Sequence, residues 1–143
     1  MRFVFVCLTL VMLVGCAASG PLFSEKTKIP LAADGKSTVY VYRLDEVLGT
    51  GSGIQTPFFD NGAKMGTLSI GGYVSYVAEP GYHELLTETY IIDKLKQMEM
   101  QAGQTYYLRI DFEGGVWTGT FSITIVPEAE ALPQISGNRY QGV

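Results

Sequence analysis

The sequence has few of the residues from which most enzyme and metal sites are built. It contains one histidine and two cysteines among 143 residues. A zinc site usually needs three or four such side chains, and nucleophilic catalysis needs a base beside the nucleophile. The histidine, His83, follows the turn sequence Pro80-Gly81, and we interpret it as a structural residue. We therefore predict no enzymatic activity, no catalytic residue, no metal and no cofactor.

Basic residues and long apolar runs are also scarce. Ten lysines and arginines oppose fourteen acidic residues, which gives a formal net charge of -4. Binding of nucleic acid without sequence preference needs a basic surface that displaces counterions from phosphate, so we expect no nucleic-acid partner. The apolar run over residues 3–14 has Thr9 as its only polar side chain. A bilayer-spanning helix needs about 20 apolar residues, so the run predicts the core of a signal peptide.

A short motif ends this run. Leu13-Val14-Gly15-Cys16 resembles the bacterial lipobox, in which the peptidase cuts before a cysteine that carries lipid. We predict a signal peptide over residues 1–15, cleavage between Gly15 and Cys16, and attachment to the membrane through acyl chains on Cys16. The expected location is the bacterial cell envelope. In a Gram-negative host, Ala17 favours the periplasmic side of the outer membrane. The alternative is an ordinary signal peptide in which Cys16 is incidental.

The remaining composition is typical of strands and turns. The sequence has 17 glycines, nine tyrosines and seven phenylalanines, and aromatic residues favour strands. Residues 16–36 show no sustained period and predict the lipidated N-terminus with a flexible tether. Twenty flexible residues give a reach of about 25 Å. We predict one domain over residues 37–132 and a loose tail over residues 133–143.

Alternation and turn signals define the expected fold. Residues 105–126 alternate apolar and polar side chains, as half-buried antiparallel strands do. Asn61-Gly62 predicts a tight hairpin. We interpret residues 85–100 as two strands and a loop rather than a helix, and expect a short helix that begins at Pro127 and stops at Pro133. About seven to eight strands predict an all-β fold, a single antiparallel β-sandwich of the Ig-like or PEGA-like kind. A small closed barrel is the alternative.

Tyrosines on the strands suggest a place for binding. Tyr40 and Tyr42 alternate with valines, and Tyr107 lies between Tyr106 and Leu108. All three are therefore expected on the opposite side of their strands from the core. An exposed row of tyrosines stacks on sugars or receives a partner protein, and we name these three as the candidate interaction surface. The alternatives are cross-strand pairs within the sandwich, or a face covered by the C-terminal segment.

Several stretches together resemble a known family. They are Thr38 to Arg43, Asn61 to Gly66 running on through Gly72-Tyr73, Glu79 to His83, and Ala102 to Tyr107. In this order they resemble the bacterial lipoproteins that carry domain of unknown function 2846, over roughly residues 37–132. Asn61 stands where that family usually has aspartate. The resemblance implies a small β domain on a lipid anchor, and it supplies no activity.

These observations lead to one functional hypothesis and two alternatives. We expect a non-enzymatic binding module, tethered to the membrane, whose partner is an envelope protein or a glycan. A structural or assembly accessory without a ligand is the first alternative. The second is a hydrolase that uses paired carboxylates, such as Glu79 with Glu84 or Asp111 with Glu113.

Overall fold

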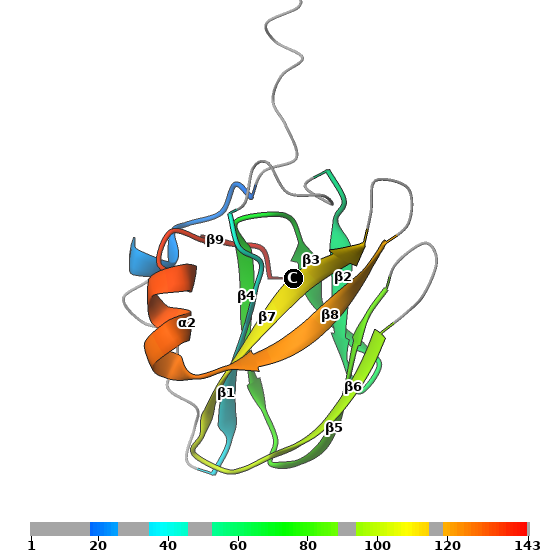
Figure 1. The fold of residues 1–143 in the computed structure, drawn as a ribbon. Coiled ribbons are helices and arrows are strands. Elements are labelled where there is room, and N and C mark those ends of the chain that lie inside the picture. The colour runs from blue at the N-terminus through cyan, green and yellow to red at the C-terminus, as the bar shows by residue number, and fades with distance from the viewer. Residues whose placement is uncertain (1–17, 26–34, 46–52, 89–93, 115–118, 143) are drawn as a thin grey trace, which may run out of the picture.

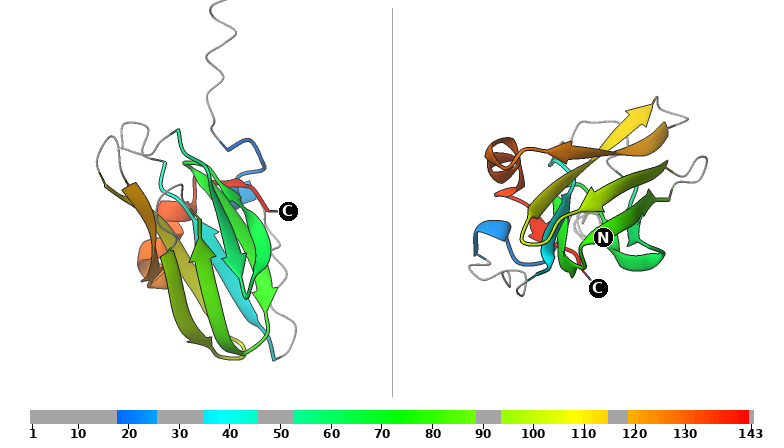
Figure 2. Two further views of the ribbon diagram at one scale, coloured as in Figure 1. Left: turned by 90° about the vertical axis from the view of Figure 1, so that its right-hand side faces the viewer. Right: turned by 90° about the horizontal axis from the view of Figure 1, so that it is seen from below.

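The strands form two sheets that pack face to face (Figure 1). The computed structural model describes residues 18–25, 35–45, 53–88, 94–114 and 119–142. One sheet has five strands in the order β8-β7-β1-β4-β9, and the other has four in the order β3-β2-β5-β6. Figure 2 shows them as two layers, so the predicted β-sandwich is confirmed. The elements are β1 (Ser37–Tyr42), β2 (Thr56–Asp60), β3 (Ala63–Leu68), β4 (Gly72–Ala78), β5 (Gly81–Thr87), β6 (Lys94–Met100), β7 (Thr105–Gly114), β8 (Gly119–Val126), α2 (Glu128–Ile135) and β9 (Arg139–Tyr140), with a 3-10 turn at Phe23–Glu25.

Two predictions from local sequence signals are confirmed. The hairpin between β2 and β3 turns at Asn61 and Gly62, whose φ angles are 48° and 79°. Positive φ at both positions is what a two-residue hairpin turn of this type requires. Residues 85–100 contain the end of β5 and all of β6, which pair antiparallel. This segment is therefore two strands, as expected.

Two strand pairs are parallel, which the antiparallel prediction missed. Strand β1 pairs antiparallel with β4 on one side and parallel with β7 on the other. Strands β4 and β9 are also parallel. A parallel pair needs a long connection, and the strands from β2 to β6 all lie between β1 and β7 in the chain. Alternation along one strand does not reveal such a distant neighbour.

Strand β1 is buried on both of its faces. Val39 and Val41 belong to the core between the two sheets. Tyr40 and Tyr42 point to the other side of the five-stranded sheet, where they join a second cluster of buried side chains. We call this second group the tyrosine cluster; its buried members are Tyr40, Tyr42, Tyr73, Tyr107, Val126, Ala131 and Ile135. The five-stranded sheet therefore has apolar contacts on both faces.

The segment after residue 132 is part of the fold and not a loose tail. Helix α2 continues through Pro133 to Ile135. Pro133 and Ala129 are exposed, and Pro133 removes one hydrogen bond near the end of the helix, where the loss is smallest. Beyond the helix, buried Asn138 donates to the carbonyl oxygens of Arg43 at 2.6 Å and Gly72 at 3.1 Å. Among the described residues, no helix is long and apolar enough to span a bilayer.

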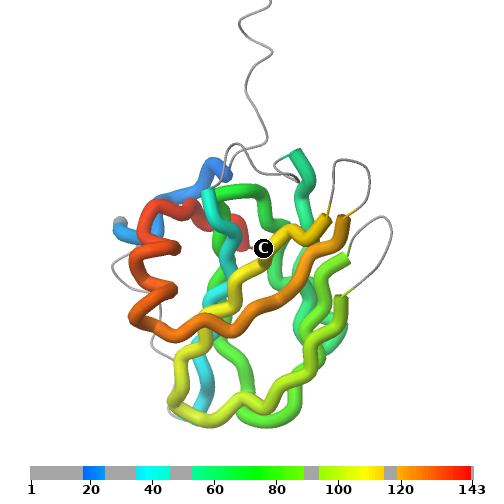
Figure 3. The backbone as a smooth tube through the Cα atoms, viewed as in Figure 1, coloured from blue at the N-terminus to red at the C-terminus, as the bar shows by residue number. Residues whose placement is uncertain are grey.

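Residues 18–25, which we call the N-terminal arm, also pack against the domain. Tyr140 N donates to the carbonyl of Pro21 at 2.9 Å, and Phe23 N donates to the carbonyl of Asn138 at 2.8 Å. Figure 3 shows the arm, in blue, beside the red C-terminal segment. The prediction of a flexible tether over residues 16–36 is therefore wrong for the arm. That prediction rested on the lack of a periodic pattern in the sequence. Backbone pairing with the two-residue strand β9 requires no such pattern.

Candidate functional site

The predicted interaction surface of three tyrosines is not at the surface. Tyr40, Tyr42 and Tyr107 are only 8%, 0% and 6% exposed. The rings of Tyr40 and Tyr107 stack with centroids 5.2 Å apart, and burial raises the pKa of Tyr40 to about 12. The prediction of an exposed row is wrong because α2 and the N-terminal arm cover this face of the sheet. Both alternatives are observed, since Tyr40 and Tyr107 form a cross-strand pair and the C-terminal segment covers this face.

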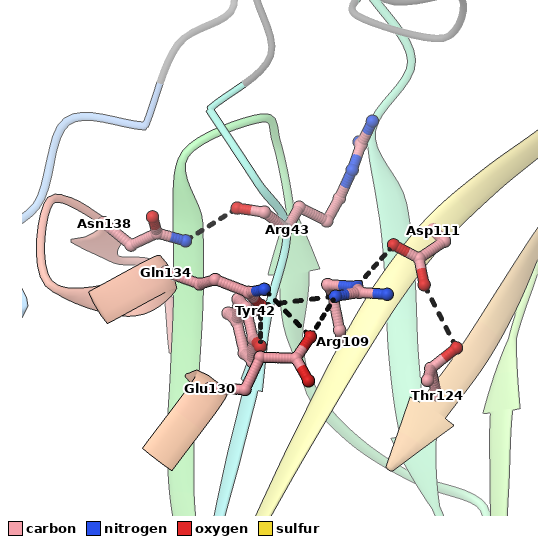
Figure 4. A network of polar contacts seen from close by, with 8 residues as sticks. All are labelled: Tyr42, Arg43, Arg109, Asp111, Thr124, Glu130, Gln134 and Asn138. Carbon is pink, nitrogen blue, oxygen red and sulfur yellow. Dashed lines mark hydrogen bonds and ion pairs between the residues drawn. The ribbon is translucent and has the colours of Figure 1, made fainter. Parts of the chain in front are cut away.

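A polar network holds α2 over the tyrosine cluster (Figure 4). The hydroxyl of Tyr42 donates to Oε1 of Gln134 at 2.6 Å. Arg109 on β7 binds Asp111 at 2.7 Å and reaches both Glu130 and Gln134 of α2 at 3.3 Å. The hydrogen bond to Asp111 raises the pKa of Arg109, so the guanidinium stays charged. The network links the helix to two strands, and its groups are engaged with one another.

A second buried charge lies between the sheets. Arg43 is 4% exposed and donates to the carbonyl oxygens of Ile54 at 2.6 Å and Leu68 at 3.2 Å. Its guanidinium carbon lies 4.6 Å from the centre of the Phe121 ring. Burial lowers its pKa to about 10. Arg43 therefore closes one end of the core by bonding to backbone oxygens.

The single histidine sits in a buried centre with an acid and a phenol. His83, at the start of β5, is 6% exposed, and Asp60, at the end of β2, is 4% exposed. Nδ1 of His83 lies 2.7 Å from Oδ1 of Asp60, and Nε2 lies 2.8 Å from the carbonyl oxygen of Glu79. The hydroxyl of Tyr76 on β4 donates to Oδ2 of Asp60 at 2.9 Å. Three strands therefore meet at one carboxylate.

These contacts determine the charge of the His83 ring. A carboxylate and a carbonyl only accept hydrogen bonds, so both ring nitrogens must donate, and only the imidazolium form can do this. Burial opposes the charge, but the hydrogen bonds to Asp60 and Glu79 outweigh it and raise the pKa of His83 above its ordinary 6.5. Nδ1 also lies 3.5 Å from Nδ2 of Asn61, which is too long to compete with Asp60.

A shallow pocket of about 220 Å³ opens beside this centre. Its lining includes Asn61, Met65, Tyr76, Val77 and Glu79 together with His83. Both nitrogens of His83 are hydrogen-bonded to protein oxygens, and each oxygen of Asp60 takes part in one hydrogen bond. In the described part of the chain, no three His, Cys, Asp or Glu side chains are grouped to hold a metal.

The outer face of the four-stranded sheet carries apolar side chains, some half-buried and some exposed, that the predicted interaction surface did not include. Phe59, Leu86 and Leu95 lie opposite one another on β2, β5 and β6, and we call them the apolar row. Leu95 and Tyr82 are each 55% exposed. Tyr82 lies opposite Glu99 on the same face. The sequence contains a signal for this face, because these side chains alternate along their strands with the buried His83, Leu85 and Met100.

A known protein family matches this region of the chain. The family described as Protein of unknown function (DUF2846) matches residues 33–121, which is more than half of the chain. The chain belongs to the DUF2846 family. Neither a curated protein nor a solved structure matches it. The DUF2846 match includes the His83 pocket and the whole four-stranded sheet, whereas the N-terminal arm, α2 and β9 lie outside it.

The other site residues predicted for this DUF2846 protein are of two kinds, those outside the described residues and those that the structure places. Gly15 and Cys16 lie outside the described residues. Among the paired carboxylates, Glu79 forms an ion pair with Lys36, Glu84 accepts from Gln97 at 3.2 Å, and Asp111 accepts from Arg109. These acids therefore make separate structural contacts. The resemblance to the DUF2846 family that the sequence showed is confirmed.

Proposed function

We propose that this DUF2846 protein is a lipoprotein of the bacterial cell envelope. The apolar run followed by Leu13-Val14-Gly15-Cys16 supports this proposal. Cleavage between Gly15 and Cys16 makes Cys16 the first residue, and its acyl chains hold the protein to the membrane. In a Gram-negative host, Ala17 after the cysteine directs it to the periplasmic side of the outer membrane.

We propose further that the sandwich is a non-enzymatic binding module, and that the apolar row with Tyr82 is its contact surface. The observation that carries this proposal is the exposure of Leu95 and Tyr82 on a strand face. Exposed Glu84 and Glu99 share that face, so a partner with apolar and basic side chains complements it. This chemistry favours an envelope protein over a glycan.

The anchor is tested with Cys16→Ser in cells fed a labelled fatty acid. We expect the native chain to take up the label and the variant to remain an uncleaved precursor without it, because the hydroxyl does not replace the thiol as lipid acceptor. Normal cleavage of the variant, or absence of label from the native chain, would contradict the lipoprotein proposal.

The contact surface is tested by photo-crosslinking in intact cells from positions 82 and 95. Leu132 on α2 is a matched control, since it is apolar and 38% exposed but lies on the other side of the molecule. We expect a protein adduct from positions 82 and 95 and none from 132. Glycan adducts would overturn the assignment to a protein partner, and adducts with a second copy alone would favour the structural role. The absence of adducts from both positions would exclude this face as the contact surface.

A further inference from the structure

The N-terminal arm pairs with the last strand of the fold. Besides the hydrogen bonds already described for Pro21 and Phe23, Leu22 forms an antiparallel bridge with Arg139. Nη1 of Arg139 donates to the carbonyl oxygen of Gly20 at 3.1 Å. The two backbones approach so closely here that a Cβ on Gly20 would lie only 2.0 Å from the carbonyl oxygen of Tyr140. The arm therefore extends the five-stranded sheet beyond β9.

Side chains of the arm add apolar contacts to this pairing. The ring of Phe23 meets the rings of Tyr40 and Tyr73 edge to face, with centroids 5.6 Å and 5.4 Å apart. Such pairs contribute beyond their buried area. Ala18, the first described residue, is only 9% exposed. The contacts with the domain begin at Gly20, whose carbonyl oxygen accepts from Arg139.

This contact leaves little chain between the fold and the proposed lipid. Cys16 precedes Gly20 by four residues, and four residues span at most about 14 Å. A free tether over residues 16–36 would allow about 25 Å instead. The acyl chains must lie in the bilayer, so the end of the sandwich that holds Gly20 must lie close to its surface.

We propose that the docked arm seats the sandwich directly on the lipid surface in one fixed orientation, with the His83 pocket turned away from the membrane. This inference rests on the proposed lipidation of Cys16. Strand β4 relates the two ends of the molecule: it begins at Gly72, which lies opposite Arg139, and ends at Ala78, which borders the pocket. At about 3.3 Å per residue, the seven residues of β4 separate these ends by about 20 Å. Figure 1 shows the arm at the upper end and the start of β5 at the lower end.

The experiment uses the full-length lipidated protein, purified from membranes and placed in vesicles of neutral lipid. A donor dye is attached to one of two positions. Gly53→Cys precedes Ile54, which accepts from Arg43 beside Asn138 at the anchored end. Ala102→Cys precedes Gly103, whose N–H donates to Lys36 beside the end of β4. Both positions are exposed. Energy transfer to an acceptor on the lipid headgroups reports the height of each dye above the bilayer. We expect the dye at 102 to stand about 20 Å higher than the dye at 53.

The matched variants are Gly20→Ala and Ser19→Ala. The methyl group at position 20 clashes with backbone that cannot move aside, so the arm leaves β9 and the height difference disappears. Ser19 is exposed, and its variant should keep the difference. Phe23→Ala is a second undocking variant, and the melting curve of each variant shows whether the sandwich stays folded.

The outcomes separate the two proposals. If the native protein does not float with vesicles or carries no fatty acid, the lipoprotein proposal fails and this inference fails with it. If it floats but both dyes stand at equal height, the anchor remains and the fixed orientation is wrong. A height difference that persists in folded Gly20→Ala and Phe23→Ala proteins would show that the arm does not set the orientation. If the height difference disappears in these two variants but persists in Ser19→Ala, the result supports an orientation fixed by the arm.

Discussion

Replacing His83 with glutamine removes the positive charge that two buried oxygens share. In the native protein the ring donates to Asp60 and to the carbonyl of Glu79. Glutamine is neutral and too differently shaped to donate to both. Asp60 then keeps only the hydroxyl of Tyr76 as a partner among those contacts.

The size of the effect follows from the burial of Asp60. Removing one partner of a fully buried ion pair costs about 3–5 kcal/mol, because the remaining charge stays uncompensated. Asp60 borders the pocket, so water reaches its surroundings, and Tyr76 still donates to it. We therefore expect His83→Gln to lower the free energy of unfolding by about 3 kcal/mol at pH 6, the lower end of that range.

The effect should depend on pH in a defined direction. The pKa of His83 is raised in the folded protein above 6.5, with Glu99 on β6 adding to the attraction from Asp60. Below pH 6.5 the ring is protonated in both folded and unfolded states, and the stabilisation is complete. As the pH rises through the folded-state pKa, the ring loses its proton and the stabilisation is lost. The difference in the free energy of unfolding between the native protein and His83→Gln should therefore become smaller from pH 6 to pH 9.

The assay is urea unfolding of the detergent-solubilised protein, followed by circular dichroism at several pH values. Gln97→Ala on β6 is the control, since Gln97 is exposed and such changes usually stay within about 0.5 kcal/mol. If His83→Gln lowers the free energy of unfolding by less than about 1 kcal/mol at pH 6, its effect is close to that of an ordinary surface substitution. That result would refute the buried ion pair. A loss that stays constant between pH 6 and pH 9 would refute the raised pKa.

Three further predictions concern the His83 centre, the contact of α2 with the sheet, and the contact of the C-terminal segment with β3. Asp60→Asn should lower the pKa of His83, because the carboxylate that favours the charged ring is gone; the chain has one histidine, so its ring signals in NMR titrations are unambiguous. Tyr42→Phe should lower the free energy of unfolding by about 1 kcal/mol through loss of the hydrogen bond to Gln134, and an unchanged urea midpoint would contradict this. Gly66→Ala should cost about 1–3 kcal/mol in the same assay, since the new methyl group would lie 2.8 Å from a backbone oxygen of the C-terminal segment.

The sequence predicts those elements whose signal lies within a few residues. The Asn61-Gly62 hairpin needs positive φ at adjacent positions, and the alternation over β7 and β8 follows from one buried face for each strand. Strand β1 shows the limit of such reasoning. Its aliphatic residues alternate with tyrosines, and this pattern predicts two different faces but not what covers the second one. Here the cover comes from both ends of the chain.

The His83 centre could not be predicted for a different reason. Its members are distant in sequence, since Asp60 and His83 are separated by 23 positions. Their contact depends on the register of β2 against β5, in which Asp60 lies opposite Leu85. A shift by one residue would move Asp60 to the outer face. The sequence predicted a structural role for His83 from its turn, but not the acid that gives it a charge.

The pairing of the arm with β9 has a consequence for the order of assembly. The hydrogen bond from Arg139 to Gly20 spans 119 positions, so it closes a loop of nearly the whole chain. Loops of this length carry a high closure entropy and form after local pairs. A chain exported from its N-terminus delivers β9 last, so the arm has no partner during export. In the proposed lipoprotein, the arm therefore stays undocked until β9 has crossed the membrane, so that its pairing does not compete with the acylation of Cys16 before then.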